Sequence, residues 1–104
     1  MNLLTKQFDD DIYKLKKFIP IVSKVHGIDH PEIKEVEKEF NKIIKKINSN
    51  HNDINVELKN ITRITNDFIV PEGVCESYKA VYIILKNITN TYVRYIQWEF
   101  KDTF

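Results

Sequence analysis

The chain has 104 residues, with 16 Lys and Arg against 15 Asp and Glu, which leaves a formal net charge of +1. A chain of this length is expected to fold as one domain, residues 1–104, around one modest core. The balanced charge excludes the global positive field of a protein that binds nucleic acid or an anionic membrane surface. No apolar run approaches the ~20 residues that a membrane span needs.

Cys75 is the single cysteine, which excludes an internal disulfide and fits a reducing compartment. Charged residues near the start, among them Lys6 and Asp9, interrupt any run that would resemble a signal peptide. We therefore expect a soluble, cytoplasmic protein with no nucleic-acid or membrane partner.

The first predicted element is an amphipathic helix that ends at "VHGID". Gly27 suits the left-handed residue beyond a helix end, and His26 lies in the last turn near the carbonyl dipole. We interpret His26 and His30 as helix-terminus residues, because no second cluster of Cys or His lies nearby in the sequence. The apolar stripe that predicts this helix steps by three and four: Leu4, Phe8, Ile12, Leu15, Ile19 and Val22.

Three more helices are predicted after this break. Pro31 suits the first position of the second helix, and "NSNHND" is a cluster of residues that favour caps and turns. The third stripe reaches Phe68, and Pro71 with Glu72 then predicts the start of the fourth helix. The stripes are Ile33, Val36, Phe40, Ile43 and Ile47; Ile54, Leu58, Ile61, Thr65 and Phe68; and Val81, Ile84, Leu85, Ile88, Tyr92, Tyr95 and Phe100. With no strand pattern in competition, the sequence predicts an all-α, up-down-up-down four-helix bundle.

One feature of the middle of the chain leaves an alternative open. Ile47 and Ile54 are seven residues apart, so the apolar phase of the second and third helices continues through the predicted turn. Residues 31–69 could therefore form one helix of ~58 Å. A monomer could not easily bury such a helix, whereas a dimer that exchanges it could.

Two stretches carry a resemblance to a known family. The stretches "SKVHGIDHPEIKEVEKEF" and "ITRITNDFIVPEGVCESYKAVYIILKNI" resemble the hemerythrin-like domain of the di-iron iron–sulfur cluster repair proteins. Those proteins are also described as regulators of cell morphogenesis and nitric oxide signalling. The resemblance implies a hemerythrin-like bundle, but the family's longer second helix and the loop after it are missing here.

The resemblance also implies a di-iron site, with ligands from all four helices. His51 and Glu99 match two of the family's ligand positions, whereas Tyr95 stands where the family has a histidine. The histidine of the first helix falls near Thr5, and the ligands of the second helix lie in the missing segment. We therefore expect a degenerate site with His51, Glu99 and Tyr95 as residual metal ligands, and with Cys75 as a packing residue. No cofactor is expected, and iron is the alternative.

Two functions follow from this interpretation. The first is a hemerythrin-like protein without metal that acts by binding itself, as a homodimer, or an unknown protein partner. A shortened bundle would leave an apolar overhang to be covered: Leu3, Leu4, Phe8, Tyr92, Tyr95, Trp98 and Phe100. The second is an iron protein that keeps a role in iron–sulfur cluster repair or in the response to oxygen or nitric oxide. The sequence contains no nucleophile–base pair or phosphate loop, so it does not favour an enzyme.

Overall fold

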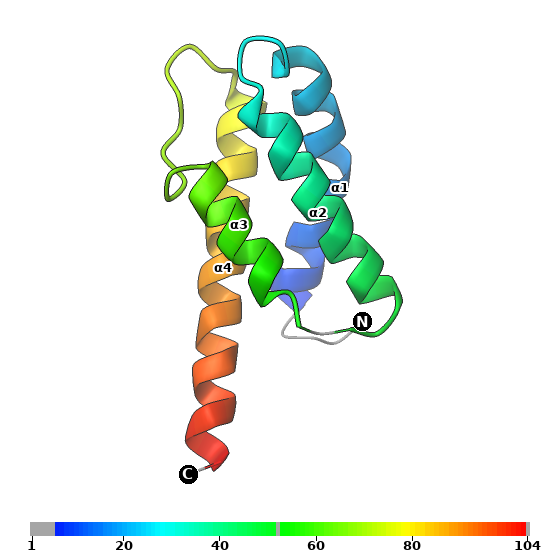
Figure 1. The fold of residues 1–104 in the computed structure, drawn as a ribbon, viewed down its shortest axis with the longest axis vertical. Helices are drawn as coiled ribbons and strands as arrows, with labels where there is room; N and C mark the ends of the chain where they lie inside the picture. The colour runs from blue at the N-terminus through cyan, green and yellow to red at the C-terminus, as the bar shows by residue number, and fades with distance from the viewer. Residues whose placement is uncertain (1–5, 52, 104) are drawn as a thin grey trace.

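Four helices make up the regular structure of the chain (Figure 1): α1 (Lys6–His26), α2 (Glu32–Asn48), α3 (Asn55–Ile64) and α4 (Glu76–Thr103). The computed structural model describes residues 6–51 and 53–103, and for residues 97–103 it describes the backbone alone. No strand occurs in these residues, so the predicted all-α class is confirmed. None of the helices in the described ranges is long and apolar enough to cross a membrane.

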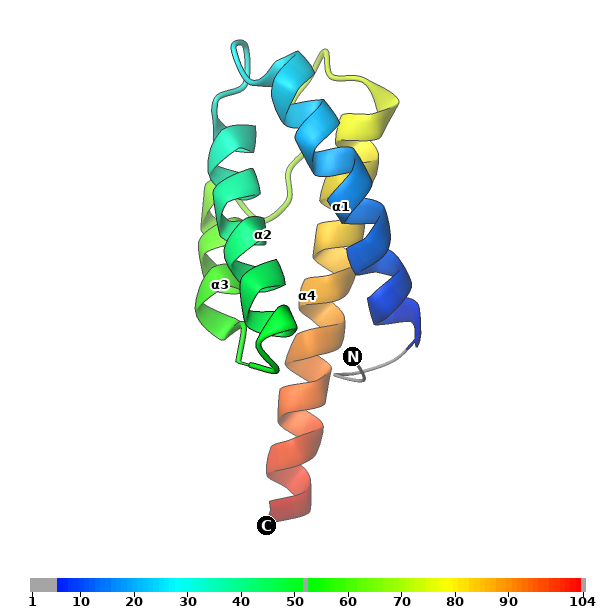
Figure 2. The same ribbon diagram turned by 90° about the vertical axis from the view of Figure 1, so that its right-hand side faces the viewer.

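One apolar core lies between the helices, and the predicted stripes supply most of it. Helix α1 packs along both α4 and α2, and α3 packs along α2, as the two perpendicular views show (Figures 1 and 2). The 3-4 spacing gives each helix one apolar face for these contacts. The side chains that are at most 2% exposed include Leu15, Ile19, Val22, Ile33, Val36, Ile43, Ile54, Ile61, Val81, Leu85 and Ile88, together with Tyr78 and Tyr82 of α4.

The turn between α2 and α3 settles the alternative of one continuous helix in favour of a hairpin. Asn50 adopts a left-handed conformation with φ of 59°. Its N–H donates to the Ile47 carbonyl at 3.0 Å, and the His51 N–H donates to the Lys46 carbonyl at 2.7 Å. This pair of bonds is the Schellman motif that ends helices. The chain therefore turns at Asn50 even though the apolar phase continues.

Helix α3 is shorter than predicted, because a second motif of the same kind stops it. The Asn66 N–H donates to the Arg63 carbonyl at 3.1 Å, and the Asp67 N–H donates to the Thr62 carbonyl at 2.8 Å. Asn66, Asp67 and Phe68 all have positive φ, between 52° and 64°. The predicted third stripe continued to Phe68, but the helix ends at Ile64.

Two predictions near the opposite end of the bundle need correction. Helix α1 ends at His26 as predicted, but Gly27 beyond it does not have a positive φ. Instead, a Cβ atom there would lie 2.4 Å from the Ser23 carbonyl oxygen and 2.5 Å from Lys34 Cε. Glycine is needed because the backbone approaches closely, not because it turns left-handed. Helix α4 begins at Glu76, after a loop, and not at the predicted Pro71.

The last turns of α4 extend beyond the ends of the other three helices (Figures 1 and 2). This extension makes the molecule elongated, with principal extents of 47 × 24 × 20 Å. The predicted overhang is nevertheless wrong at two positions, because Phe8 and Tyr92 are only 2% and 3% exposed and belong to the core. Tyr95 is half-buried. The other predicted members (Leu3, Leu4, and the side chains of Trp98 and Phe100) lie outside the described residues.

Buried Glu39 links α2 to α3, and we expect its protonation in acid to lower the stability of the fold. Its carboxylate accepts hydrogen bonds from Asn60 at 3.0 Å and Lys42 at 3.1 Å. The Asn60 bond, aided by Lys42, holds the pKa of Glu39 below its usual value of 4.5. A lowered folded-state pKa stabilises the protein above the unfolded value, and this stabilisation is lost as the pH falls through the folded value. We expect the thermal midpoint to fall as the pH drops below 4.5.

Thermal melts from neutral to acid pH test this expectation. Glu39→Gln should melt lower at neutral pH and lose part of the acid dependence. Glu76→Gln is the control, since the Glu76 side chain is 92% exposed and its ion pair with Lys79 lies at the surface. Equal acid dependence in wild type and Glu39→Gln would contradict the assignment.

Candidate functional site

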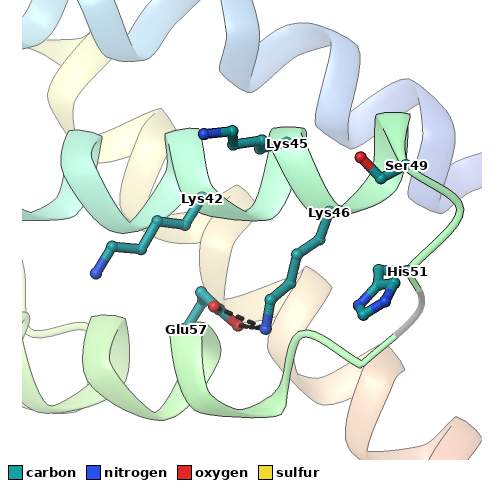
Figure 3. A pocket seen from close by; sticks show the side chains of 6 residues that line it. All are labelled: Lys42, Lys45, Lys46, Ser49, His51 and Glu57. Atoms are coloured by element: carbon teal, nitrogen blue, oxygen red, sulfur yellow. Dashed lines mark hydrogen bonds and ion pairs between the residues drawn. The ribbon is translucent and has the colours of Figure 1, made fainter.

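The predicted metal ligand His51 is exposed in the turn between α2 and α3, at the edge of a surface pocket of about 450 Å³ (Figure 3). The pocket is lined by Lys42, Lys45, Lys46, Ser49, His51 and Glu57. The carboxylate of Glu57, the one acidic side chain among the described lining residues, already has a cationic partner. Lys46 Nζ lies 2.9 Å and 3.0 Å from its two oxygens. The hydrogen bond to Glu57 is the main cause that raises the pKa of Lys46.

The charge of this pocket opposes a bound cation. Its described lining contains three lysines and one glutamate, so the net charge of these residues is positive and repels a cation. Lys46 also donates to the Asp53 carbonyl at 3.0 Å, so it closes the turn as well as neutralising Glu57. His51 is therefore next to a lysine–glutamate pair that holds the turn together, and within residues 6–51 and 53–96 no group of carboxylates around it is arranged to bind a metal.

The other two predicted ligands lie on the far part of α4. Tyr95 packs near Tyr92, with ring centroids 6.5 Å apart. Tyr92 receives a hydrogen bond of 3.4 Å from the Ile54 N–H, and burial raises the pKa of its hydroxyl. This contact attaches α4 to the start of α3. Glu99 follows Tyr95 by one turn of α4, but its side chain lies outside the described residues.

A di-iron centre needs a cluster of imidazoles and carboxylates at this end of the bundle. Within residues 6–51 and 53–96, no group of three or more His, Cys, Asp or Glu side chains is arranged to hold a metal ion. The residues that the structure describes therefore do not fit a di-iron group.

The opposite end of the bundle brings together the two stretches that carry the family resemblance. Here α1 turns into α2, and α4 begins (Figure 1). His26 Nε2 lies 3.1 Å from the sulfur of Cys75. The Cys75 side chain is exposed, and His26 is half-buried. The Cys75 carbonyl accepts a 3.2 Å bond from the Lys79 N–H, so Cys75 caps the start of α4.

The buried Tyr78 ring packs against both His26 and His30. Its ring centroid lies 5.3 Å from that of His26 and 5.6 Å from that of His30, both in edge-to-face orientations. Its hydroxyl donates to Glu32 Oε1 at 3.3 Å and pairs with the Tyr82 hydroxyl at 3.2 Å. Edge-to-face contacts and buried hydrogen bonds of this kind fix ring orientation.

The same carboxylate also holds the second histidine. His30 Nδ1 lies 3.3 Å from the Glu32 oxygen that receives the Tyr78 hydroxyl. Burial raises the pKa values of Tyr78 and Tyr82 above the usual tyrosine range, so both hydroxyls stay protonated and act as donors. Tyr78 therefore contacts both imidazole rings, and Glu32 also contacts that of His30, so neither ring extends freely into solvent.

Two sequence interpretations are wrong at this end. Cys75 is exposed and is not a packing residue. The chain also does contain a nucleophile next to a base, because His26 contacts Cys75. His26 and His30 lie at the end of α1 and just before α2, as predicted, and Tyr78 packs against both of them. His26 and Cys75 are 49 residues apart, so no local spacing indicated the pair; their positions in the two resembling stretches were the one available signal.

Comparison with protein-family models, with curated proteins and with solved structures finds no match for this chain. The hemerythrin-like resemblance therefore rests on the residues of the two stretches alone.

Proposed function

We propose that this chain is a hemerythrin-like, up-down-up-down bundle that acts by self-association as a homodimer and not through a di-iron centre. The observation that carries the proposal is the part of α4 that extends past α1, α2 and α3 (Figures 1 and 2). Among the helices that the structure describes, none accompanies this extension, and large exposed apolar patches mark interaction sites (Figures 1 and 2).

The sequence of the extension supports a binding role. The helical period puts Tyr95, Ile96 and Phe100 on one side of the axis, together with Glu99. Arg94, Gln97, Trp98 and Lys101 fall on the other side. Aromatic residues are enriched among the residues that dominate binding energy in interfaces. A second copy of the chain could cover this apolar side by pairing the two extensions.

The environment of His51 supports the proposal that the chain does not act through a di-iron centre. A lysine-lined pocket disfavours a metal cation, and Glu57 is already paired with Lys46. The alternative, an iron protein with a repair or gas-response role, requires iron to remain bound through purification. Metal analysis together with an absorption scan for oxo-bridged iron therefore separates the two, and we expect iron well below one atom per chain.

Replacing Phe100 tests which segment makes the dimer. Phe100→Glu puts a charge on the apolar side, and loss of an aromatic residue at the centre of an interface typically costs about 2 kcal/mol or more. We expect the dissociation constant to rise at least about 30-fold. Trp98→Glu also replaces an aromatic residue with a glutamate, but on the opposite side of the helix, and is expected to leave the dimer unchanged. Equal dissociation constants for the two variants, measured by sedimentation, would refute α4 as the contact.

A further inference from the structure

We propose that Cys75 is a site of reversible mixed-disulfide formation with small disulfides, with His26 as the base that accepts its proton. The thiol does not stand alone: His26 Nε2 lies 3.1 Å from its sulfur, within hydrogen-bond reach. A nucleophile in contact with a base that a third group orients is the arrangement of an activated thiol. Tyr78 is that third group, because its ring packs edge-on against His26 at 5.3 Å.

The position of the pair favours reaction with molecules from solution. The Cys75 side chain is exposed at the start of α4. The Tyr78 ring that packs against His26 is buried, and its hydroxyl is hydrogen-bonded to that of buried Tyr82. Cys75 also immediately precedes α4, and its carbonyl accepts the hydrogen bond from the Lys79 N–H. The same sulfur is therefore both open to solvent and in contact with a base.

The chemistry balances without any further redox partner. In the tautomer that carries its proton on Nδ1, His26 takes the Cys75 thiol proton on Nε2. The Cys75 sulfur then attacks one sulfur of a small disulfide, the S–S bond breaks, and the leaving thiolate takes a proton from the imidazolium. Cys75 is oxidised to a mixed disulfide, and the other half of the small disulfide is reduced to a thiol.

The number of cysteines in the chain determines that the mixed disulfide is the end product of the reaction. Cys75 is the only cysteine, so no second thiol of the same chain can attack the mixed disulfide and release the bound group. The attached group remains until an external thiol removes it. The site lies at the end of the bundle opposite the α4 extension (Figure 1), so this inference is independent of the proposed dimer contact.

The test measures the rate at which the folded, full-length chain reacts with dithiobis-nitrobenzoate, which reports the released aromatic thiolate by absorbance. His26→Gln keeps a polar side chain but removes the base, and we expect the rate to fall at least about tenfold. His51→Gln is the control, because it makes the same change at an exposed histidine in the turn between α2 and α3, at the other end of the bundle (Figure 1); its rate should stay within about twofold of wild type. An unchanged rate in His26→Gln overturns the proposal.

A second measurement covers the case in which His26→Gln does not fold. The wild-type thiol should react more slowly in concentrated urea than in the native state, after correction with free cysteine in the same solvents, because unfolding separates Cys75 from His26. A native rate equal to or below the unfolded rate overturns the proposal.

The product identifies the chemical class of the partner. Incubation of the wild-type chain with oxidised glutathione should give a single chain that carries one glutathione by intact mass, and excess reduced thiol should remove it. No adduct, or only a disulfide-linked pair of chains, would overturn the assignment of a small disulfide as the substrate.

Discussion

Tyr78→Ala is expected to lower the free energy of unfolding by about 3 to 5 kcal/mol, the range for removing a large buried aromatic side chain. Tyr78 is 0% exposed and is the residue on which His26, His30, Glu32 and Tyr82 converge. Its loss opens a cavity and also leaves buried polar groups without partners. Small domains are stable by only about 5 to 15 kcal/mol, so this variant should be close to unfolded at body temperature.

Urea unfolding at equilibrium, followed by circular dichroism, measures this effect. Tyr13→Ala is the matched control, because Tyr13 is 60% exposed and its ring lies at the surface, 4.7 Å from the Lys17 ammonium. The cost of this change should stay below about 1 kcal/mol. Tyr78→Phe isolates the hydroxyl and should cost about 1 to 2 kcal/mol. Similar losses for Tyr78→Ala and Tyr13→Ala would show that the cluster does not support the bundle.

Gly27→Asn is expected to cost about 3 kcal/mol, the upper part of the range for overpacking a tight site. The added Cβ would meet the Ser23 carbonyl oxygen at 2.4 Å, and a backbone atom cannot move aside as a flexible side chain can. Gly73→Asn makes the same change where nothing lies within 4 Å. Gly73 has φ of 77°, a left-handed conformation that asparagine tolerates better than other residues, so its cost should stay below about 1 kcal/mol.

Thermal unfolding of the two asparagine variants compares them directly. The Gly27 variant should melt well below the Gly73 variant, because the first has a steric conflict and the second only a backbone preference. The reverse order would mean that the connection between α1 and α2 is looser than the structure indicates.

Most of the helices and the core could be predicted because apolar periodicity depends on local spacing. The stripes through Leu15, Ile33, Ile61 and Leu85 are buried as expected, since one apolar face on each helix leaves few ways to pack. The boundaries were harder, because helix ends depend on single residues that tolerate left-handed backbone. Asn66 and Asp67 end α3 although the stripe continues to Phe68, and only the Asn-Asp pair in the sequence indicated that stop.

The candidate site could be predicted less well, because it depends on contacts between distant segments. His26 and Cys75 meet only after α1 and α4 have packed side by side. His51, Tyr95 and Glu99 were predicted as metal ligands because each matches one position of the family, and such a match contains no information on the charges that surround a residue in the fold. The lysines around His51 belong to α2, and their effect appears only once α2 and α3 have formed a hairpin.

Sedimentation velocity of the wild-type chain at roughly tens of micromolar, recorded in the ultraviolet and visible, shows whether the chain forms a dimer without iron. We expect one boundary with twice the 12.4 kDa mass of a single chain and without the absorption of oxo-bridged iron. A boundary at the mass of one chain, above all one that carries that absorption, would contradict it.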